Sequence, residues 1–428
     1  MSSSLEDSVM ASTISRFNFY TINFNSFISS PSNFRILRTI SPRTISPPTP
    51  PTPTNLTSRG LDSLDGYFSS KSYYPSTDAL KDYGSITQSS PQTLYILDSS
   101  FNPPTLAHAH ICLSALRDHY ASPDLRHTKA RLLLLLSTQN ADKKITGARL
   151  EERLVGIECF ATDLLTSWIY RHSAYYYRNK KNPATSAGSE STSESDTENE
   201  SGNEDLHSSG VESEHESNSK STIPPPSNPS HSDSPSASPE IDIALTSLPY
   251  FHDKSAAIEK SAIYPPGTTH IHCTGYDTLI RVLNPKYYPP THDLSPLIPF
   301  LERHKLRVTY RTSDDGSHTK EDQDTYLSTM TSELPKLGGL SDWVTEKRIY
   351  MAEGLEGDEI SSTKVRDVIR SYSLPSPHTK GPGSSKRKGK GKTPEKLIKE
   401  RLKGLVGEGV RKWILGEKLY FHERKNRT

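Results

Sequence analysis

One short run restricts the fold of this chain more than any other feature. Residues 130–136 read A-R-L-L-L-L-L. A strand with one solvated face alternates apolar and polar residues, whereas a continuous apolar run is typical of a parallel strand covered by helices on both faces. The run is strand-sized and far shorter than the roughly 18 apolar residues of a membrane helix. We therefore predict a buried strand of an α/β sheet and no membrane association.

The segments around this run alternate between helix and strand patterns. Apolar residues recur at helical spacing across residues 149–165, and a second helix is expected over about 106–119. Short apolar runs predict further strands at residues 93–98, 270–274, 306–310 and 348–351. Alternating strands and helices favour parallel pairing with helical crossovers. We therefore expect an α/β fold, a Rossmann-like doubly wound parallel sheet, in a single domain with long disordered inserts.

Composition indicates where those inserts lie. Only 32% of the residues are hydrophobic, which is a low share for a globular domain. Residues 1–61 are rich in Ser, Thr and Pro and are expected to form a disordered arm. Residues 181–240 are expected to form an acidic disordered insert, and residues 375–393 a basic flexible insert. The domain itself would comprise a first part, a second part and a C-terminal helical part, at residues 62–180, 241–374 and 394–428.

The formal net charge of +1 conceals two opposed segments. Residues 186–240 contain 12 acidic residues and one Lys, whereas residues 380–403 contain 10 basic and two acidic residues. Because the charge of the whole chain is near zero, we expect no nucleic-acid partner. The basic cluster at residues 386–392 is consistent with a nuclear import signal and equally with a solubilising insert. The sequence defines neither protein partners of these segments nor an oligomeric state.

The cysteines and the N-terminal residues bear on the compartment. Cys112, Cys159 and Cys273 lie far apart without metal-ligand spacing, which predicts reduced thiols and a location in the cytoplasm, the nucleus or both. The N-terminal residues lack the uninterrupted apolar stretch of a secretory signal. Their arginines resemble a mitochondrial transit peptide only faintly, because Glu6 and Asp7 add negative charge. A mitochondrial location is therefore disfavoured.

A first candidate site follows the strand predicted at residues 93–98. Residues 98–108 read D-S-S-F-N-P-P-T-L-A-H and lead into a predicted helix. Ligands of open parallel sheets bind beyond the carboxyl ends of the strands, and a helix N-terminus attracts phosphate. Thr105 can cap this helix, and His108 in its first turn can donate a hydrogen bond to a phosphate oxygen. The alternative is a simple turn of Pro and Asn with a surface histidine.

A second candidate site lies near the end of the core, where residues 359–366 read E-I-S-S-T-K-V-R. Ser361 or Ser362 can cap a helix whose N-terminus is again suited to an anion. Lys364 and Arg366 add cations, and Arg can hold two phosphate oxygens at once. The alternative is a well-capped surface helix with solvated charges.

Together these segments resemble the signatures of the nicotinamide-mononucleotide adenylyltransferases of the nucleotidyltransferase superfamily, G-S-F-N-P…T-x-x-H and I-S-S-T-x-x-R. Residues 360–366 match at every fixed position, whereas residues 99–108 have Ser99 in place of the leading Gly. Residues 274–277, T-G-Y-D, resemble the family's G-x-D, and residues 410–420 are similar to its closing helix. The resemblance covers the predicted core and none of the tails, and it is closest to a divergent, fungal-type branch.

The resemblance implies roles for individual residues. Catalytic roles fall to His108, Lys364 and Arg366. Lys143 and Lys144, in the loop after the second strand, would bind the mononucleotide. Trp168 is a candidate to stack on the nicotinamide and is equally suited to the core. ATP or nucleotide binding is implied for Ser99, Ser100, Phe101, Asn102, Thr105, Gly275, Asp277, Ser361, Ser362 and Thr363.

The resemblance also implies a reaction, in which the phosphate of nicotinamide or nicotinate mononucleotide attacks ATP to give the dinucleotide NAD and pyrophosphate. Mg²⁺ is expected to enter with ATP as substrate, and no metal site of the protein is expected, because His270 and His272 lack a third ligand. One alternative is a nucleotidyltransferase of the same fold for another phosphate-bearing acceptor. Another is a weakly ATP-hydrolysing or non-catalytic regulatory relative, which Ser99 and the charged inserts motivate.

Overall fold

The computed structural model describes residues 3–42, 92–139, 146–181, 239–311, 319–354, 360–373 and 393–421. The chain divides into two units, residues 1–171 with 237–428, and residues 172–236. The first unit contains the sheet, and of the second only residues 172–181 are described, as the end of a helix. The inserts predicted at residues 181–240 and 375–393 lie outside the described residues except at their margins, and their predicted disorder stays a prediction.

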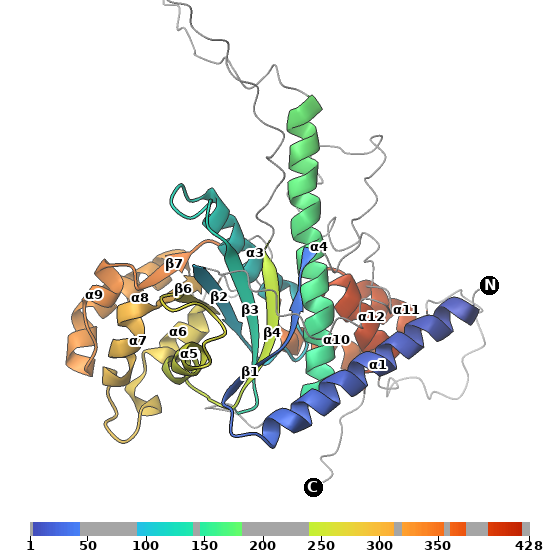
Figure 1. The fold of residues 1–428 in the computed structure, drawn as a ribbon, viewed down its shortest axis with the longest axis horizontal. Coiled ribbons are helices and arrows are strands. Elements are labelled where there is room, and N and C mark those ends of the chain that lie inside the picture. Colours follow the sequence, from blue (N-terminus) through green and yellow to red (C-terminus); the bar gives the residue numbers. More distant parts are fainter. Residues whose placement is uncertain are drawn as a thin grey trace, which may run out of the picture. The chain divides into compact units, whose positions relative to one another are not determined.

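A seven-stranded sheet with the order β1-β4-β3-β2-β5-β6-β7 forms the centre of the first unit (Figure 1). All pairs from β4 to β7 are parallel, and β1 pairs with β4 in the antiparallel sense. This arrangement confirms the predicted Rossmann-like α/β class, with an antiparallel edge strand in addition. The strands are β1 Phe34–Ile40, β2 Thr93–Asp98, β3 Ala130–Ser137, β4 Glu240–Thr246, β5 Thr269–Gly275, β6 Lys305–Thr309 and β7 Ile349–Ala352.

The order of the strands creates a reversal next to β2. From β2 the chain proceeds outward through β3 to β4, then returns to the other side of β2 as β5 and proceeds outward to β7. Connections therefore leave β2 and β5 in opposite directions. A crevice opens at such a switch point beyond the carboxyl ends of the strands, and it is where doubly wound proteins bind ligands.

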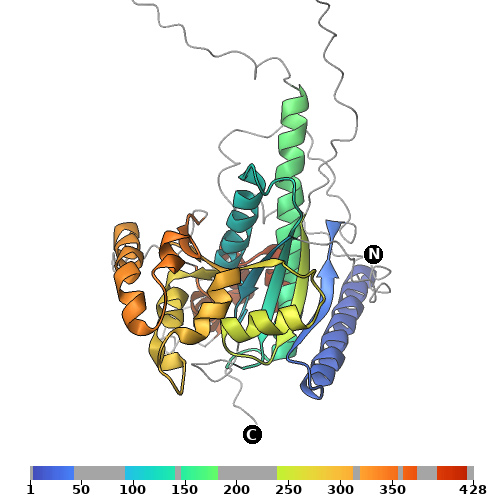
Figure 2. The same ribbon diagram turned by 60° about the vertical axis from the view of Figure 1, so that its left-hand side comes forward.

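The apolar run in β3 is buried on both faces of the sheet. Leu132, Leu134 and Leu136 belong to the cluster that includes residues of helices α3 (Leu106–Ala121) and α4 (Leu150–Lys181). Leu133 and Leu135 belong to another cluster, with Ile258 of α5 (Phe251–Lys260). Figure 2 shows α4 in green and α5 in yellow on opposite faces of the strands. A strand covered twice has no polar face, which is the physical reason for the continuous apolar run.

The other described helices lie after β5 in the chain: α6 to α9 come between β5 and β7, and α10 to α12 follow β7. They are α6 Tyr276–Val282, α7 Ile298–Arg303, α8 Lys320–Glu333, α9 Asp342–Thr345, α10 Ser362–Ser373, α11 Pro394–Arg401 and α12 Glu408–Gly416, with 3₁₀ turns at Pro285–Tyr287, Ser295–Leu297 and Leu334–Leu337. Within the described chain, no helix combines the length and the apolar character needed to cross a membrane.

The N-terminal region departs from the sequence prediction. Residues 1–61 were expected to be a disordered arm, but they contain helix α1 (Ser3–Ile28) and strand β1. Arg16 of α1 and Arg38 of β1 both approach the buried Glu158 carboxylate of α4, at 3.3 and 2.7 Å. These arginines, which faintly resembled a transit peptide in the sequence, are buried ion-pair partners. The prediction was wrong because the partner of this segment lies more than a hundred residues away in the sequence.

Candidate functional site

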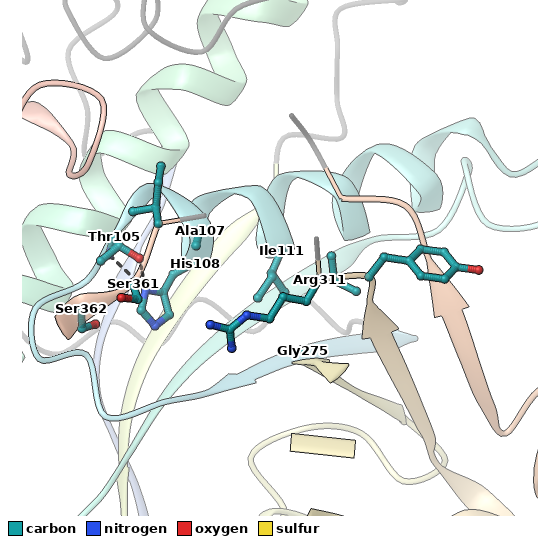
Figure 3. A pocket seen from close by; sticks show the side chains of 11 residues that line it. Thr105, Ala107, His108, Ile111, Gly275, Arg311, Ser361 and Ser362 are labelled. Atoms are coloured by element: carbon teal, nitrogen blue, oxygen red, sulfur yellow. Dashed lines mark hydrogen bonds between the residues drawn. The ribbon is translucent and has the colours of Figure 1, made fainter. Parts of the chain in front are cut away.

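A cleft opens at the switch point, beyond the carboxyl ends of β5 and β6 (Figure 3). Its wall comes from the first turns of α3, the ends of these two strands and the start of α10. The lining residues are Thr105, Ala107, His108, Ile111, Gly275, Thr309, Tyr310, Arg311, Ile360, Ser361 and Ser362. The two sequence motifs and the Gly after the third predicted strand therefore meet in one place.

The two motifs are hydrogen-bonded to each other. The Ser362 hydroxyl donates to the Pro103 carbonyl at 2.7 Å, and the Arg366 guanidinium donates to the Asn102 carbonyl at 2.5 Å. Ser361 is the cap of α10, because its hydroxyl oxygen accepts from the Lys364 N–H at 3.1 Å. The N-termini of α3 and α10 are thereby held beside the same cleft, where the positive ends of the two helix dipoles favour an anion.

His108 is held in one protonation state and one tautomer. Its Nδ1 accepts from the Thr105 N–H at 3.0 Å, and its Nε2 lies 2.9 Å from the Ser99 hydroxyl oxygen. Burial lowers the pKa of His108 to about 4, so the ring is neutral at pH 7. Because Nδ1 accepts, the single ring proton is on Nε2. His108 thus offers one N–H donor to the Ser99 side of the cleft without carrying a charge.

The Phe101 ring packs against the His108 ring. Its side chain is fully buried, with its ring centroid 5.3 Å from that of His108 and 6.3 Å from that of Phe160. Its φ of +43° lies in the left-handed region, which is costly for a bulky residue. Since the Phe101 ring is not accessible, any contact of this residue with a nucleotide would be through its backbone.

Asn102 uses its side chain within the protein. Its Nδ2 donates to the Thr146 carbonyl at 2.7 Å, and its Oδ1 accepts from the Ala148 N–H at 3.3 Å. Gly147, with a φ of +88°, makes this contact feasible, because a Cβ there would lie 2.6 Å from Asn102 Nδ2. The Asn102 side chain therefore holds the loop, and the predicted nucleotide-binding role of Asn102 stays a prediction.

Arg153 of α4 is a loop-holding residue that the sequence prediction missed. Its guanidinium is buried and donates to the Ser100 carbonyl at 3.2 Å and to the Ala148 carbonyl at 2.9 Å. The sequence did contain a signal for this role, namely an arginine inside the apolar stripe at residues 149–165. A guanidinium buried there needs several hydrogen-bond acceptors. Ser100, predicted to bind nucleotide, is exposed at the loop surface.

The two predicted catalytic cations are not in the wall of the cleft. Lys364 is exposed on α10. The Arg366 guanidinium donates to the Asn102 carbonyl and, at 3.0 Å, to the Thr363 hydroxyl oxygen. Arg366 thus joins the motifs, and its hydrogen bonds are made to the protein. Their catalytic roles stay predictions.

Arg311 is the cation that the structure places in the cleft, and the sequence prediction did not single it out. It lies two residues after the end of β6, and its guanidinium extends into the space between His108 and Gly275 (Figure 3). There it forms an ion pair with Asp277, for which the resemblance implied nucleotide binding. A Cβ added to Gly275 would meet nothing within 4 Å, so the space beside this residue is open. Its position just after a strand of the parallel sheet was the signal that could have identified Arg311.

The candidate mononucleotide residues lie elsewhere. Trp168 is buried in the core with its ring centroid 5.4 Å from that of Tyr120, at the other end of α3 from Thr105. The sequence left open whether Trp168 lies at the nicotinamide or in the core, and the structure has it in the core. Lys143 and Lys144 lie outside the described residues, and their role stays a prediction.

The histidines of β5 are part of the core. His270 stacks on His304 with 4.2 Å between ring centroids, and His272 Nε2 lies 2.8 Å from the Ser255 hydroxyl. Within the described chain there is no group of three or more His, Cys, Asp or Glu side chains that could hold a metal ion. The expectation that Mg²⁺ enters with ATP is a separate matter and stays a prediction.

The fold and the cleft define a class: a Rossmann-like α/β protein in which two helix N-termini and a neutral histidine meet at the switch point. No family model matches the chain. The chain is similar to a protein of Schizosaccharomyces pombe named "Putative nicotinamide mononucleotide adenylyltransferase". The two are 25% identical over 281 residues, which cover 65% of this chain and 77% of the relative.

Proposed function

We propose that this protein is a nicotinamide-mononucleotide adenylyltransferase, which joins ATP and nicotinamide or nicotinate mononucleotide to give the dinucleotide and pyrophosphate. One observation carries the proposal. The two segments that resemble the family's signatures, far apart in the sequence, are hydrogen-bonded through Ser362 and Pro103 beside a cleft that His108 lines. The name of the Schizosaccharomyces pombe relative points to the same activity.

The proposed chemistry needs little from the protein beyond positioning. An oxygen of the mononucleotide phosphate forms a bond to the α-phosphorus of ATP. The bond from that phosphorus to the oxygen bridging to the β-phosphorus breaks, and its electron pair leaves with pyrophosphate. The nucleophile is already an anion at neutral pH, so no general base is required. Mg²⁺ would enter with ATP as part of the substrate and neutralise phosphate charge.

His108 suits this chemistry as a hydrogen-bond donor. A neutral imidazole with its proton on Nε2 can donate to a phosphate oxygen on which negative charge develops. The pKa of His108, lowered to about 4, keeps the ring in this form throughout the neutral range. The helix N-termini at Thr105 and Ser361 would add fixed partial positive charge beside the same oxygens.

The test is formation of the dinucleotide by the purified chain from ATP, Mg²⁺ and either mononucleotide. We expect His108→Ala to lower kcat by about two to three orders of magnitude, which is the scale of losing one preorganised donor. His127→Ala, which removes an exposed histidine, is the matched control and should leave kcat unchanged. Near-normal dinucleotide formation by a folded His108→Ala protein would refute the assignment.

One observation favours a second candidate, a weakly ATP-hydrolysing or non-catalytic relative. The Ser99 hydroxyl oxygen lies 2.9 Å from the Nε2 of His108. It therefore accepts the hydrogen bond that His108 would otherwise donate to a phosphate. The products distinguish the candidates. Dinucleotide formation supports the adenylyltransferase, inorganic phosphate indicates ATP hydrolysis, and pyrophosphate that appears only with another phosphate-bearing acceptor indicates a different nucleotidyltransferase.

A further inference from the structure

The cleft contains a cation that neither sequence motif supplies. Among its described lining residues, Arg311 is the one Lys or Arg side chain. His108 in the same wall is neutral, because burial lowers its pKa to about 4. Attack of one phosphate on the α-phosphorus of ATP requires charge neutralisation at the phosphates. Within the described wall of the cleft, Arg311 is the side chain that can supply a full positive charge.

The backbone of Arg311 is fixed by a buried glutamine. Gln323 of α8 is fully buried; its Oε1 accepts from the Arg311 N–H at 3.0 Å, and its Nε2 donates to the Arg311 carbonyl at 2.6 Å. An amide is costly to bury unless both of its ends are hydrogen-bonded, and here both ends bind the main chain of one residue. The Cα of Arg311 is therefore held in place, while its side chain is 48% exposed and reaches into the cleft.

The present partner of the Arg311 guanidinium is one that a phosphate can replace. Asp277 is 43% exposed, and exposed ion pairs contribute little because water solvates both charges. A phosphate carries more charge than a carboxylate and fits the guanidinium through two parallel hydrogen bonds. The ion pair with Asp277 is thus a resting arrangement that leaves Arg311 available to a phosphate ligand.

A second group on the same wall also points to a ligand. Thr309, two residues before Arg311, lines the cleft and is only 4% exposed. In the described part of the chain its hydroxyl has no hydrogen-bond partner. Buried hydroxyl groups are nearly always satisfied, so a group that comes with the ligand is expected to complete this one.

We propose that Arg311 is the phosphate-binding cation of the cleft, which exchanges Asp277 for phosphate oxygens of the nucleotide, with the Thr309 hydroxyl as a second contact. This inference rests on the proposed function, since it concerns the same cleft. It assigns to the end of β6 the charge neutralisation that the sequence prediction had assigned to Lys364 and Arg366.

The experiment measures binding of inorganic pyrophosphate to the full chain by titration calorimetry at low salt. We expect Arg311→Gln to weaken binding about 10- to 100-fold, the range for losing hydrogen bonds between charged groups. Arg311→Lys, which retains the charge but not the paired donors, should recover part of the affinity. Arg303→Gln is the matched control: Arg303 is also a largely exposed arginine paired with a carboxylate, that of Glu259, but it lies before β6 rather than after it.

The outcomes separate this inference from the proposed function. Unchanged pyrophosphate affinity in Arg311→Gln, with an unchanged melting temperature, overturns the inference. Asp277→Asn should retain or strengthen pyrophosphate binding, and a loss as large as that of Arg311→Gln would also overturn it. Arg311-dependent pyrophosphate binding by a protein that forms no dinucleotide would refute the proposed function and leave the inference standing. If Arg311→Gln leaves dinucleotide formation unchanged, the proposed function stands and the inference about Arg311 is overturned.

Discussion

At the scale of single residues, the conformation of the loop before α3 depends on Gly147, which packs against the side-chain amide of Asn102. Gly147 combines a φ of +88° with a position where a Cβ would lie 2.6 Å from Asn102 Nδ2. Gly147→Ala should therefore lower the free energy of unfolding by about 1–3 kcal/mol. It should also reduce dinucleotide formation, because Asn102 would be pushed out of its hydrogen bonds to residues 146–148. Urea unfolding and the activity assay check both expectations.

A matched control for Gly147→Ala exists in the same chain. Gly267 has a φ of +81°, but a Cβ there would meet nothing within 4 Å. Gly267→Ala therefore carries the same kind of backbone strain without the collision and should leave activity unchanged. Equal effects of the two substitutions on activity would show that Asn102 does not depend on the space beside Gly147.

Which residues gather at the cleft could be predicted from the sequence, but where their side chains point could not. Thr105, His108 and Ser361 line the cleft as their helix-start positions indicated. Arg366 was expected at a phosphate, yet its guanidinium binds the Asn102 carbonyl, 264 residues away. Such a direction depends on how two distant loops meet. Arg311 was missed because no local pattern distinguishes it from other surface arginines.

At the scale of elements, the docking of α1 and β1 onto α4 depends on one carboxylate. Glu158 is 1% exposed and lies between Arg16 and Arg38. Glu158→Gln would remove the carboxylate that pairs with the guanidinium groups of Arg16 and Arg38, and removing one partner of a buried pair costs about 3–5 kcal/mol. We expect faster hydrogen exchange across β1, measured by mass spectrometry, with little change in β2 and β5.

The control for Glu158→Gln is Glu333→Gln, because Glu333 is 42% exposed and pairs with Lys336 on the surface. An exposed pair is worth about 0–1 kcal/mol, so hydrogen exchange across β1 should not change in this variant. If exchange across β1 is the same in Glu158→Gln as in the unmodified chain, then apolar packing and the strand ladder alone hold this segment.

Elements with a simple period were predictable, and elements without one were not. The strands β2, β3, β5, β6 and β7 are apolar runs, and their positions were predicted within about two residues. β1 was missed because its buried residues Phe34, Leu37 and Ile40 are three apart, and a register shift between Ile36 and Arg38 interrupts the alternation. β4 was missed because Asp242 lies in its middle, where Arg131 neutralises it at 2.7 Å.

At the scale of the whole molecule, buried histidines make stability depend on pH. Burial lowers the pKa of His270 to about 3 and that of His272 well below its usual value of 6.5. Below pH 6.5 the unfolded chain therefore binds protons that the folded chain does not bind. Each such histidine lowers the free energy of unfolding by up to about 1.4 kcal/mol per pH unit between pH 6.5 and its folded pKa.

Two buried carboxyl groups, those of Asp163 and Asp242, act in the opposite direction, because burial raises the pKa of each. Burial raises the pKa of Asp163, which accepts from the Gly409 N–H at the start of α12, to about 7. The folded chain holds this proton between pH 4 and 7, so Asp163 alone would lower stability as pH rises through that range. Among the described residues, six histidines have a lowered pKa and oppose two carboxyl groups with a raised pKa, so we expect the free energy of unfolding to fall from pH 7 to pH 5, as measured by urea titration. Asp163→Asn should steepen the fall, and a flat profile would contradict the account.

The edge of the sheet also has a consequence for how the chain is made. β1 is synthesised before β4, yet β4 is its neighbour in the ladder, with Phe34 opposite Thr246. A nascent chain that ends before residue 246 has therefore produced β1 without the strand it needs. During translation this first-made strand must wait, unpaired, while the centre of the sheet assembles from later residues. This strand can therefore join its sheet only after β2, β3 and β4 have been made.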